Sequence, residues 1–336
     1  MCRHLAYVGL PEPVGELLTR GDHSLFNQSW EPRDMRRGGT VNADGFGVAW
    51  WIRGQVAADV DAVESRTLGA QHHAPAEDGH GSVPLVASRY RNVSPIWSDP
   101  AVTEVLPQLW STAVLAAVRS ATAGMPVERS ACAPFTHGRW AFSHNGTVPG
   151  WTTVLPAVAA EFGSPPLVEA ESHTDSAALW VIVRGLLDSL PPPADTDLSG
   201  AVVSPSPTGV ATPTPSWAAP DGVEQRQEAP ASAAPQSGET ATPATVLRDV
   251  VRAVLAHAPD ARLNFLLSDG NTIWATAWYH SLSVLVDEEF VVVSSEPYDD
   301  DPRWQPIRDR CLVTASLTDL SVSDLDVSAD RERPRP

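Results

Sequence analysis

The sequence predicts an α+β fold, in which strands come early and late in the chain and helices come in the middle. Three early runs are short, rich in β-branched and aromatic residues, and followed by turn residues, which is typical of strands; they are 46–52, 114–120 and 139–145. Four more such runs are separated by Asp-Gly and Glu-Glu turns; they are 262–270, 272–279, 282–289 and 290–297. Strands from both ends can complete one layered sheet system, with helices packed on it.

Two helices are predicted on either side of a segment of unusual composition. Residues 174–190 have a helical pattern, with Thr174 or Asp175 at its start and three prolines after its end. Residues 244–259 read as an amphipathic helix. The segment 191–243 is rich in Pro, Ala, Ser and Thr and offers no core-forming face, so we expect a disordered insertion. The expected organisation is one domain over 1–327, interrupted by 191–243, with a disordered tail over 328–336.

Charge and composition exclude several classes of function. The 336 residues carry a net charge of -18, which argues against nucleic acid or an anionic membrane as the main partner. All 23 basic residues are arginines, so neither a lysine Schiff base nor a Walker lysine can exist in this chain. No apolar stretch reaches 18 residues, and the first residues contain no secretory signal. The histidines of 71–81 suggest a solvated loop and not a metal site, and we expect no metal and no cofactor.

Three scattered cysteines form no disulfide framework and indicate a reducing cytoplasm. Cys2 differs from the other two by its position, because loss of the initiator Met would make it the first residue. Its thiol is then a nucleophile, and its own α-amine, with a reference pKa of about 7.7–8.0, is a base beside it. We expect Cys132 and Cys311 to be buried apolar thiols.

An oxyanion hole is the next requirement of such a site, and the segment 142–151 offers one. Asn145 brings an amide donor, and Gly146 allows a backbone N–H to come close to a developing oxyanion. Asn-Gly is also the commonest hairpin signal, so a type I′ turn is the alternative. The pair Asp44-Gly45 has the same ambiguity.

Two charged residues are candidates for binding an amino-acid head group. Arg119 ends an apolar strand and could bind a carboxylate through both of its terminal nitrogens, although a structural ion pair is the alternative. Asp175 lies at a helix start, where it could bind an ammonium group or simply serve the helix as a capping or first-turn acid.

Taken together, Cys2, N-A-D-G-F-G, R-S-A-T, S-H-N-G and T-D-S resemble the class II glutamine amidotransferase domain, an N-terminal-nucleophile hydrolase. The resemblance implies a four-layer αββα sandwich in which Cys2 attacks a γ-glutamyl amide and Asn145 and Gly146 form the oxyanion hole. It also implies that Arg119, with Thr122 nearby, binds the glutamyl carboxylate and that Asp175 binds the ammonium. Many members have two histidines around this arginine, where the present chain has alanines at 117 and 123.

A narrower resemblance extends from residue 1 into the 310s. M-C-R-H-L, S-R-Y-R-N, P-D-A-R-L-N and S-E-P-Y-D-D-D-P-R-W are similar to the branch that removes the γ-glutamyl group from γ-glutamyl-hercynylcysteine S-oxide in ergothioneine biosynthesis. The implied partners are this small molecule and, beyond it, other enzymes of that pathway. Tyr298, Asp299 and Asp300 are candidates for the leaving-group side, because a trimethylammonium is bound by aromatic faces and negative charge.

Three other functions remain open from the sequence. Two are enzymatic: a glutaminase subunit that supplies ammonia to a partner, and a glutathione-type γ-glutamyl hydrolase. The third is a non-catalytic γ-glutamyl-binding scaffold, which would need Arg119 and Asp175 but would have no use for Cys2 and Asn145.

Overall fold

The computed structural model describes residues 2–34, 41–54, 84–191 and 241–325. By its internal contacts the chain divides into two units, one of residues 1–189 with 241–336 and one of residues 190–240. The first unit contains every helix and strand described below. Nearly all of the predicted insertion 191–243, the predicted tail 328–336 and the histidine-rich loop lie outside the described residues.

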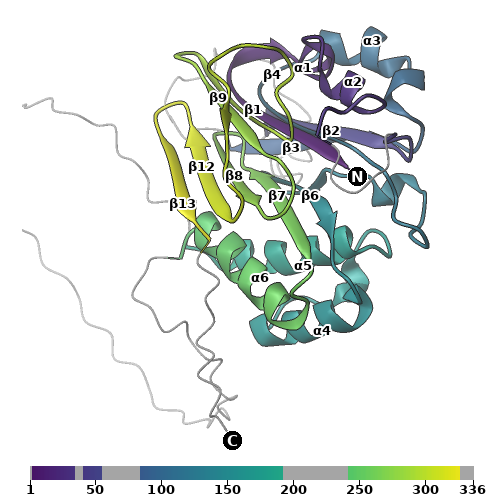
Figure 1. The fold of residues 1–336 in the computed structure, drawn as a ribbon, viewed down its shortest axis with the longest axis vertical. Coiled ribbons are helices and arrows are strands. Elements are labelled where there is room, and N and C mark those ends of the chain that lie inside the picture. The colour runs from purple at the N-terminus through teal and green to yellow at the C-terminus, as the bar shows by residue number, and fades with distance from the viewer. Residues whose placement is uncertain (1, 35–40, 55–83, 192–240, 326–336) are drawn as a thin grey trace, which may run out of the picture. The chain divides into compact units, whose positions relative to one another are not determined.

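Within these residues, two antiparallel sheets form the centre of the fold (Figure 1). The seven-stranded sheet has the order β11 (Gln305–Pro306), β9 (Ser283–Val286), β10 (Phe290–Ser294), β1 (Arg3–Pro13), β4 (Trp110–Val118), β2 (Phe46–Arg53) and β3 (Leu85–Asn92). The six-stranded sheet has the order β13 (Leu320–Asp324), β12 (Cys311–Ser316), β8 (Thr272–Ala277), β7 (Arg262–Ser268), β6 (Trp140–Thr147) and β5 (Phe135–His137).

Helices cover the outer face of each sheet, and Figure 1 shows them as two separate groups. The seven-stranded sheet carries α1 (Val14–Thr19), α2 (Leu25–Gln28) and α3 (Ala101–Glu104). The six-stranded sheet carries α4 (Trp151–Phe162), α5 (Asp175–Asp188) and α6 (Pro243–His257). Short 3₁₀ turns are η2 (Ile96–Ser98), η3 (Leu106–Gln108), η4 (Arg129–Ala131) and η5 (Leu167–Glu169). The predicted α+β class and the four-layer αββα order are confirmed.

Apolar side chains fill the spaces between these layers, and β1 shows how. Its alternate residues Leu5 and Tyr7 pack against α1 and α2, while Ala6 and Val8 pack between the two sheets. A strand covered on both faces is apolar at successive positions, because neither face meets water. Beneath the other helices, the Phe142 ring of β6 stacks on Trp180 of α5 at a centroid distance of 5.5 Å.

The two long helices begin where local capping chemistry places their starts. The Thr174 side chain accepts a hydrogen bond from the Ala177 N–H, so Thr174 is the N-cap and Asp175 the first residue of α5. Thr242 and Thr245 form a reciprocal capping box before α6, and Pro243 occupies its first turn. The helix therefore begins at the very end of the predicted insertion. No helix among the described residues is long and apolar enough to cross a membrane.

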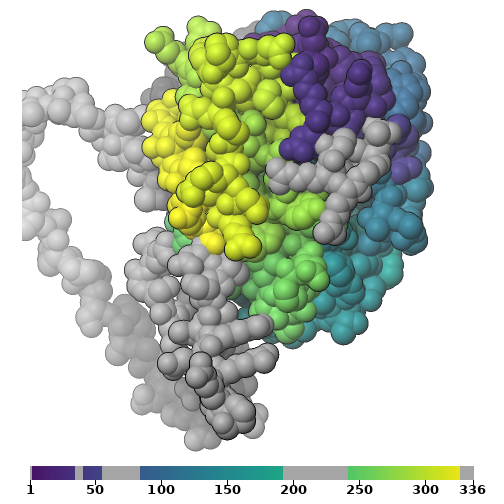
Figure 2. All heavy atoms as spheres, in the orientation of Figure 1, coloured from purple at the N-terminus to yellow at the C-terminus, as the bar shows by residue number. Residues whose placement is uncertain are grey.

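One end of the seven-stranded sheet gathers the segments that the sequence analysis singled out. β1 begins at Arg3, opposite Val118 at the end of β4, and Leu5 pairs with Ser294 at the end of β10. The loops that precede β2 and follow β4 and β10 consequently surround Cys2. Figure 2 shows the N-terminal part of the chain, in purple, adjoining its C-terminal part, in yellow-green, on the surface.

Candidate active site

Cys2 lies directly before β1 and is the half-buried member of the three free cysteines. Its sulfur lies 3.8 Å from the carbonyl oxygen of Ser120, and its own carbonyl accepts a hydrogen bond from Arg3 at 3.0 Å. Cys132 and Cys311 are buried, as predicted. Burial raises the pKa of the Cys132 thiol to about 11, which leaves it protonated and unreactive at neutral pH.

Asn145 and Gly146 belong to the body of β6 and not to a turn. Asn145 pairs with Asn264 and Gly146 with Leu263 of β7, so the hairpin alternative is wrong. Gly146 has a structural reason to be glycine, because a Cβ there would lie 1.9 Å from the carbonyl oxygen of Arg262. Asn145 is 1% exposed, yet neither its Oδ1 nor its Nδ2 has a hydrogen-bond partner. A buried, unpaired amide costs about 1–3 kcal/mol, and such groups in native proteins call for an explanation such as a ligand.

Strand alternation indicates the direction in which Asn145 points. Ala141 packs in the apolar cluster between the sheets, together with residues of β1 that come after His4. Two residues further along β6, the Ser143 hydroxyl lies 3.2 Å from Nδ1 of His4 itself. Asn145 is the next residue of β6 on this face. Moving from Ala141 to Asn145 therefore moves toward the start of β1, where Cys2 lies.

Arg119 lies on the β4 side of Cys2, in a loop held by backbone contacts. Its N–H donates to Gly45 O at 2.8 Å and its carbonyl accepts from Asp44 N at 3.0 Å, while the Asp44 carboxylate accepts from Ala121 N at 2.7 Å. Gly45 has a φ of 113°, a conformation that side chains rarely adopt. Among the described residues Arg119 forms no ion pair, and its buried Nη1 has no hydrogen-bond partner. This guanidinium can therefore accept an anion as a partner. Thr122 follows in the same loop, and its side chain is exposed.

Asp175 is 6% exposed and connects α5 to the segment that follows Asn145. Its Oδ2 accepts a hydrogen bond from Val148 N at 2.9 Å, and its Oδ1 accepts from Ser176 N at 2.8 Å. Oδ1 also accepts from the Ser176 hydroxyl at 3.4 Å, so it is Oδ2, with one hydrogen-bond partner, that can still accept from an ammonium. Asp175 is therefore both a first-turn acid of the helix and a neighbour of the predicted oxyanion hole.

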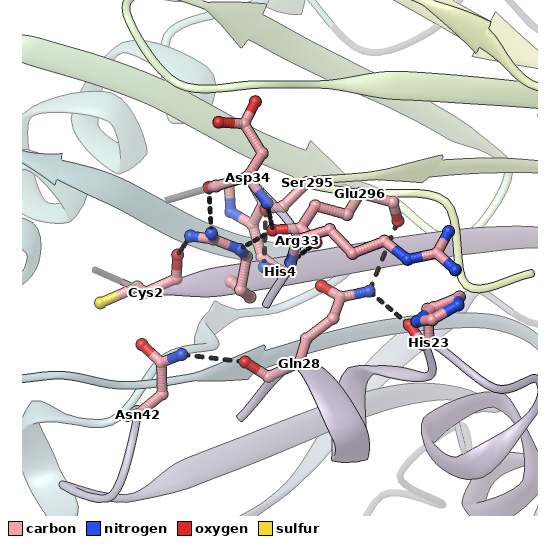
Figure 3. Close-up of polar contacts among 10 residues, drawn as sticks. Cys2, His4, His23, Gln28, Arg33, Asp34, Asn42, Ser295 and Glu296 are labelled. Carbon is pink, nitrogen blue, oxygen red and sulfur yellow. Dashed lines mark hydrogen bonds and ion pairs between the residues drawn. The ribbon is translucent and has the colours of Figure 1, made fainter. Parts of the chain in front are cut away.

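The sequence analysis did not single out the buried ion pair between Arg3 and Glu296 (Figure 3). Arg3 is 1% exposed and Glu296 3%, and Nε of Arg3 lies 2.7 Å from Oε1 of Glu296. The carboxylate also accepts from the backbone N–H groups of Arg33 and Asp34, at 2.7 and 3.1 Å. Arg3 in turn donates to the carbonyls of Asp34 and Cys2. The only sequence signal was an arginine in an otherwise apolar strand.

Two buried histidines, His4 and His144, lie near the site and were not predicted from the sequence to belong to it. Burial, with the nearby charges of His144, His280 and Arg3, lowers the pKa of His4 to about 3. His144 binds Ser176 Oγ and the carbonyl of residue 262, and burial lowers its pKa as well, against the opposing effect of the Asp175 charge. Both rings are therefore neutral at pH 7.

The acidic segment after β10 is only partly exposed. Tyr298 is 4% exposed and packs in the core, with its ring edge-on to Trp304 at 5.1 Å. Asp299 accepts a hydrogen bond from the Trp304 ring nitrogen at 2.7 Å, and Asp300 forms an exposed ion pair with Arg33 at 3.0 Å. The Tyr298 ring consequently offers no open face to a ligand, whereas Asp300 remains at the surface.

Two curated proteins of the same name are similar to nearly the whole chain. The chain is 33% identical over 327 residues to a gamma-glutamyl-hercynylcysteine sulfoxide hydrolase of Mycolicibacterium smegmatis, covering 97% of this chain and 100% of that protein. It is 31% identical to the protein of the same name from Mycobacterium tuberculosis strain CDC 1551, covering 97% of both chains.

More distant similarities reach proteins named for glutamine amidotransfer. A probable glutamine amidotransferase of Saccharomyces cerevisiae is 29% identical over 194 residues, which are 56% of this chain and 46% of the yeast protein. The structure of a class-II domain protein from Silicibacter pomeroyi has a TM-score of 0.48 and 19% identity, covering 96% of this chain and 99% of that one. No protein-family model matches the chain.

Proposed function

The chain belongs to the gamma-glutamyl-hercynylcysteine sulfoxide hydrolase family, and from this premise we propose that it hydrolyses the γ-glutamyl amide of that sulfoxide. The products are glutamate and hercynylcysteine sulfoxide, as ergothioneine biosynthesis requires. The observation that supports this most directly is a half-buried Cys2 at the start of β1, together with a buried amide of Asn145 that has no hydrogen-bond partner.

In the proposed mechanism, loss of Met1 exposes the α-amine of Cys2. The amine takes the thiol proton, and the sulfur attacks the γ-carbonyl carbon to form a tetrahedral oxyanion. Asn145 Nδ2 and the Gly146 backbone donate hydrogen bonds to that oxyanion. As the C–N bond breaks, the proton passes to the leaving amine and a γ-glutamyl thioester remains on Cys2. Water then attacks the thioester, which releases glutamate and restores the thiol.

Arg119 and Asp175 hold the glutamyl group during both steps. The free Nη1 of Arg119 binds the α-carboxylate, because a guanidinium and a carboxylate pair through charge-assisted hydrogen bonds. Asp175 uses the remaining lone pair of Oδ2 to accept from the α-ammonium. Thr122 lies exposed in the loop after Arg119, and we assign it to the same group. This chemistry needs neither a metal nor a cofactor.

The compartment that we propose is the cytoplasm, because all three cysteines are free thiols and a reducing environment preserves a nucleophilic Cys2. Other enzymes of ergothioneine biosynthesis are the proposed neighbours of this one, since they make its substrate and consume its product. Neither proposal affects the chemistry at the site.

The test is product analysis with purified protein on γ-glutamyl-hercynylcysteine sulfoxide, glutamine and glutathione. We expect glutamate and the sulfoxide amine from the first substrate, with the other two as poor substrates. Intact mass should show a chain without Met1, and Cys2→Ala should abolish turnover while the matched Cys132→Ala retains it. A chain that keeps Met1 while fully active, or an active Cys2→Ala variant, would refute the mechanism. Equal turnover of glutamine would leave only the broader amidohydrolase assignment.

A further inference from the structure

A cavity of about 380 Å³ lies beside the Arg3–Glu296 ion pair, on the side of β1 away from Arg119. Its walls include Arg33, Asp34, Ser295, Glu296, Trp304 and Ile307. Two of these residues also contact the first residues of β1, since Glu296 pairs with Arg3 and the Ser295 hydroxyl accepts from the His4 N–H at 3.0 Å. The volume lies within the range of small-molecule sites.

The order of strands places this cavity opposite the proposed glutamyl site. β1 lies between β4, which leads into Arg119, and β10, which leads into Glu296. Cys2 comes just before β1, the strand between the two, and its thiol contacts the Ser120 carbonyl on the β4 side. A substrate whose glutamyl end occupies the β4 side has its reacting carbonyl at Cys2, and the rest of the molecule extends toward the β10 side.

Opposite charges line this cavity. Arg33 is half exposed, and its ion pair with Asp300 involves a carboxylate that is 81% exposed. Such an exposed pair is worth about 0–1 kcal/mol, so a ligand carboxylate can compete for Arg33 at little cost. Asp34 adds a carboxylate. In Figure 3 the Arg33 guanidinium and the Asp34 carboxylate extend in different directions, away from the backbone contacts of these residues with Glu296. The half-buried ring of Trp304 supplies an aromatic wall.

We propose that this cavity binds the leaving amine of the substrate and that Arg33 binds a carboxylate of that leaving group. The inference rests on the proposed function and deepens it. The hercynyl end is a betaine, with a carboxylate next to a trimethylammonium that cannot donate hydrogen bonds. The carboxylate fits the guanidinium of Arg33, and the quaternary ammonium fits the face of Trp304. Glutamine has no such group and leaves the cavity unused.

The test compares two substrates in three proteins: the wild type, Arg33→Gln, and Arg308→Gln as the matched control. Arg308 also forms an exposed ion pair, at 2.9 Å with Asp324, but lies outside the cavity lining. Arg33→Gln should lower kcat/KM for the sulfoxide conjugate by about 10–100-fold, the usual worth of a hydrogen bond to a charged group. For glutamine the loss should stay below about threefold, and Arg308→Gln should change neither value.

Two outcomes overturn the inference: an equal loss on both substrates, or no loss on the conjugate. The fold should survive the substitution, because Glu296 holds the backbone N–H of Arg33 and not its side chain. A thermal melt of Arg33→Gln checks this. If the wild type fails to hydrolyse the conjugate, the proposed function is wrong. If the wild type hydrolyses the conjugate and Arg33→Gln does so equally well, only the role of the cavity is wrong.

Discussion

Replacing Glu296 by Gln removes one charge from the most deeply buried ion pair among the described residues, while it keeps the size of the side chain. In the wild type the two carboxylate oxygens accept from Arg3 Nε and from the backbone N–H groups of Arg33 and Asp34. An amide keeps one acceptor oxygen and turns an NH₂ group toward a donor. The variant therefore loses at least one hydrogen bond and removes the carboxylate charge that lies against the buried guanidinium of Arg3.

Breaking a buried pair by removing one partner costs about 3–5 kcal/mol. We expect a loss of this size in the free energy of unfolding, which is a large part of the ~5–15 kcal/mol of a typical domain. The exposed pair of Arg308 and Asp324, whose side chains are 78% and 72% exposed, provides the comparison. Arg308→Gln should cost at most about 1 kcal/mol.

Urea denaturation of the wild type, Glu296→Gln, Arg3→Gln and the double variant measures these differences. The double variant should be less destabilised than the sum of the single variants, because the second substitution removes a charge that was already unpaired. Activity provides a second measurement. Arg3 holds the Cys2 carbonyl, so Glu296→Gln should lower kcat more than it raises KM at temperatures where the variant is folded. A stability loss no larger than that of Arg308→Gln would refute the reasoning.

Three further predictions concern the site and its surroundings. Asn145→Ala should lower kcat by about 10²–10³ with little change in KM, as for the loss of one oxyanion donor, and a raised KM with unchanged kcat would contradict that role. A substrate analogue without the α-amine should bind the wild type weakly and lose little further affinity in Asp175→Asn; equal losses for the amine-bearing and the amine-free ligand would remove Asp175 from the ammonium site. Burial chiefly lowers the pKa of both His4 and His280 to about 3, so between pH 6.5 and 3 the unfolded chain binds protons that the folded chain does not. The free energy of unfolding should then fall as pH falls through this window, by up to about 1.4 kcal/mol per pH unit for each histidine, and His4→Gln should show a shallower slope in denaturation at pH 7, 6 and 5.

The sequence predicted those parts of the molecule whose signals are local. Residues 174–190 carry their own capping residue and stop signal, and α5 lies within them. Cys2, Asn145, Arg119 and Asp175 each stand in a short motif, so neighbouring residues alone are enough to single them out. The roles assigned to them stay predictions.

Other features depend on contacts that no local pattern contains. Arg3 and Glu296 are 293 positions apart, and only the pairing of β1 with β10 brings them together. Asn145-Gly146 has the sequence of a turn, but pairing with β7 makes it part of a strand. Tyr298 stands in an acidic run that reads as surface, yet its ring packs in the core. The helix α4 was not predicted, and it contains a proline at 156.

The division of the site by β1 has a consequence for selectivity. In the proposed function, Arg119 and Asp175 bind groups that every γ-glutamyl amide has, so these two residues would not distinguish glutamine from a larger conjugate. Discrimination between substrates has to arise where their structures differ, which under our proposal is the β10 side with Arg33 and its cavity. Binding energy gained there can also be used to press the scissile amide against Cys2, and it then appears in kcat and not only in KM. A small γ-glutamyl amide should therefore be turned over slowly even at saturation, because it fills the glutamyl side and leaves the orienting side empty.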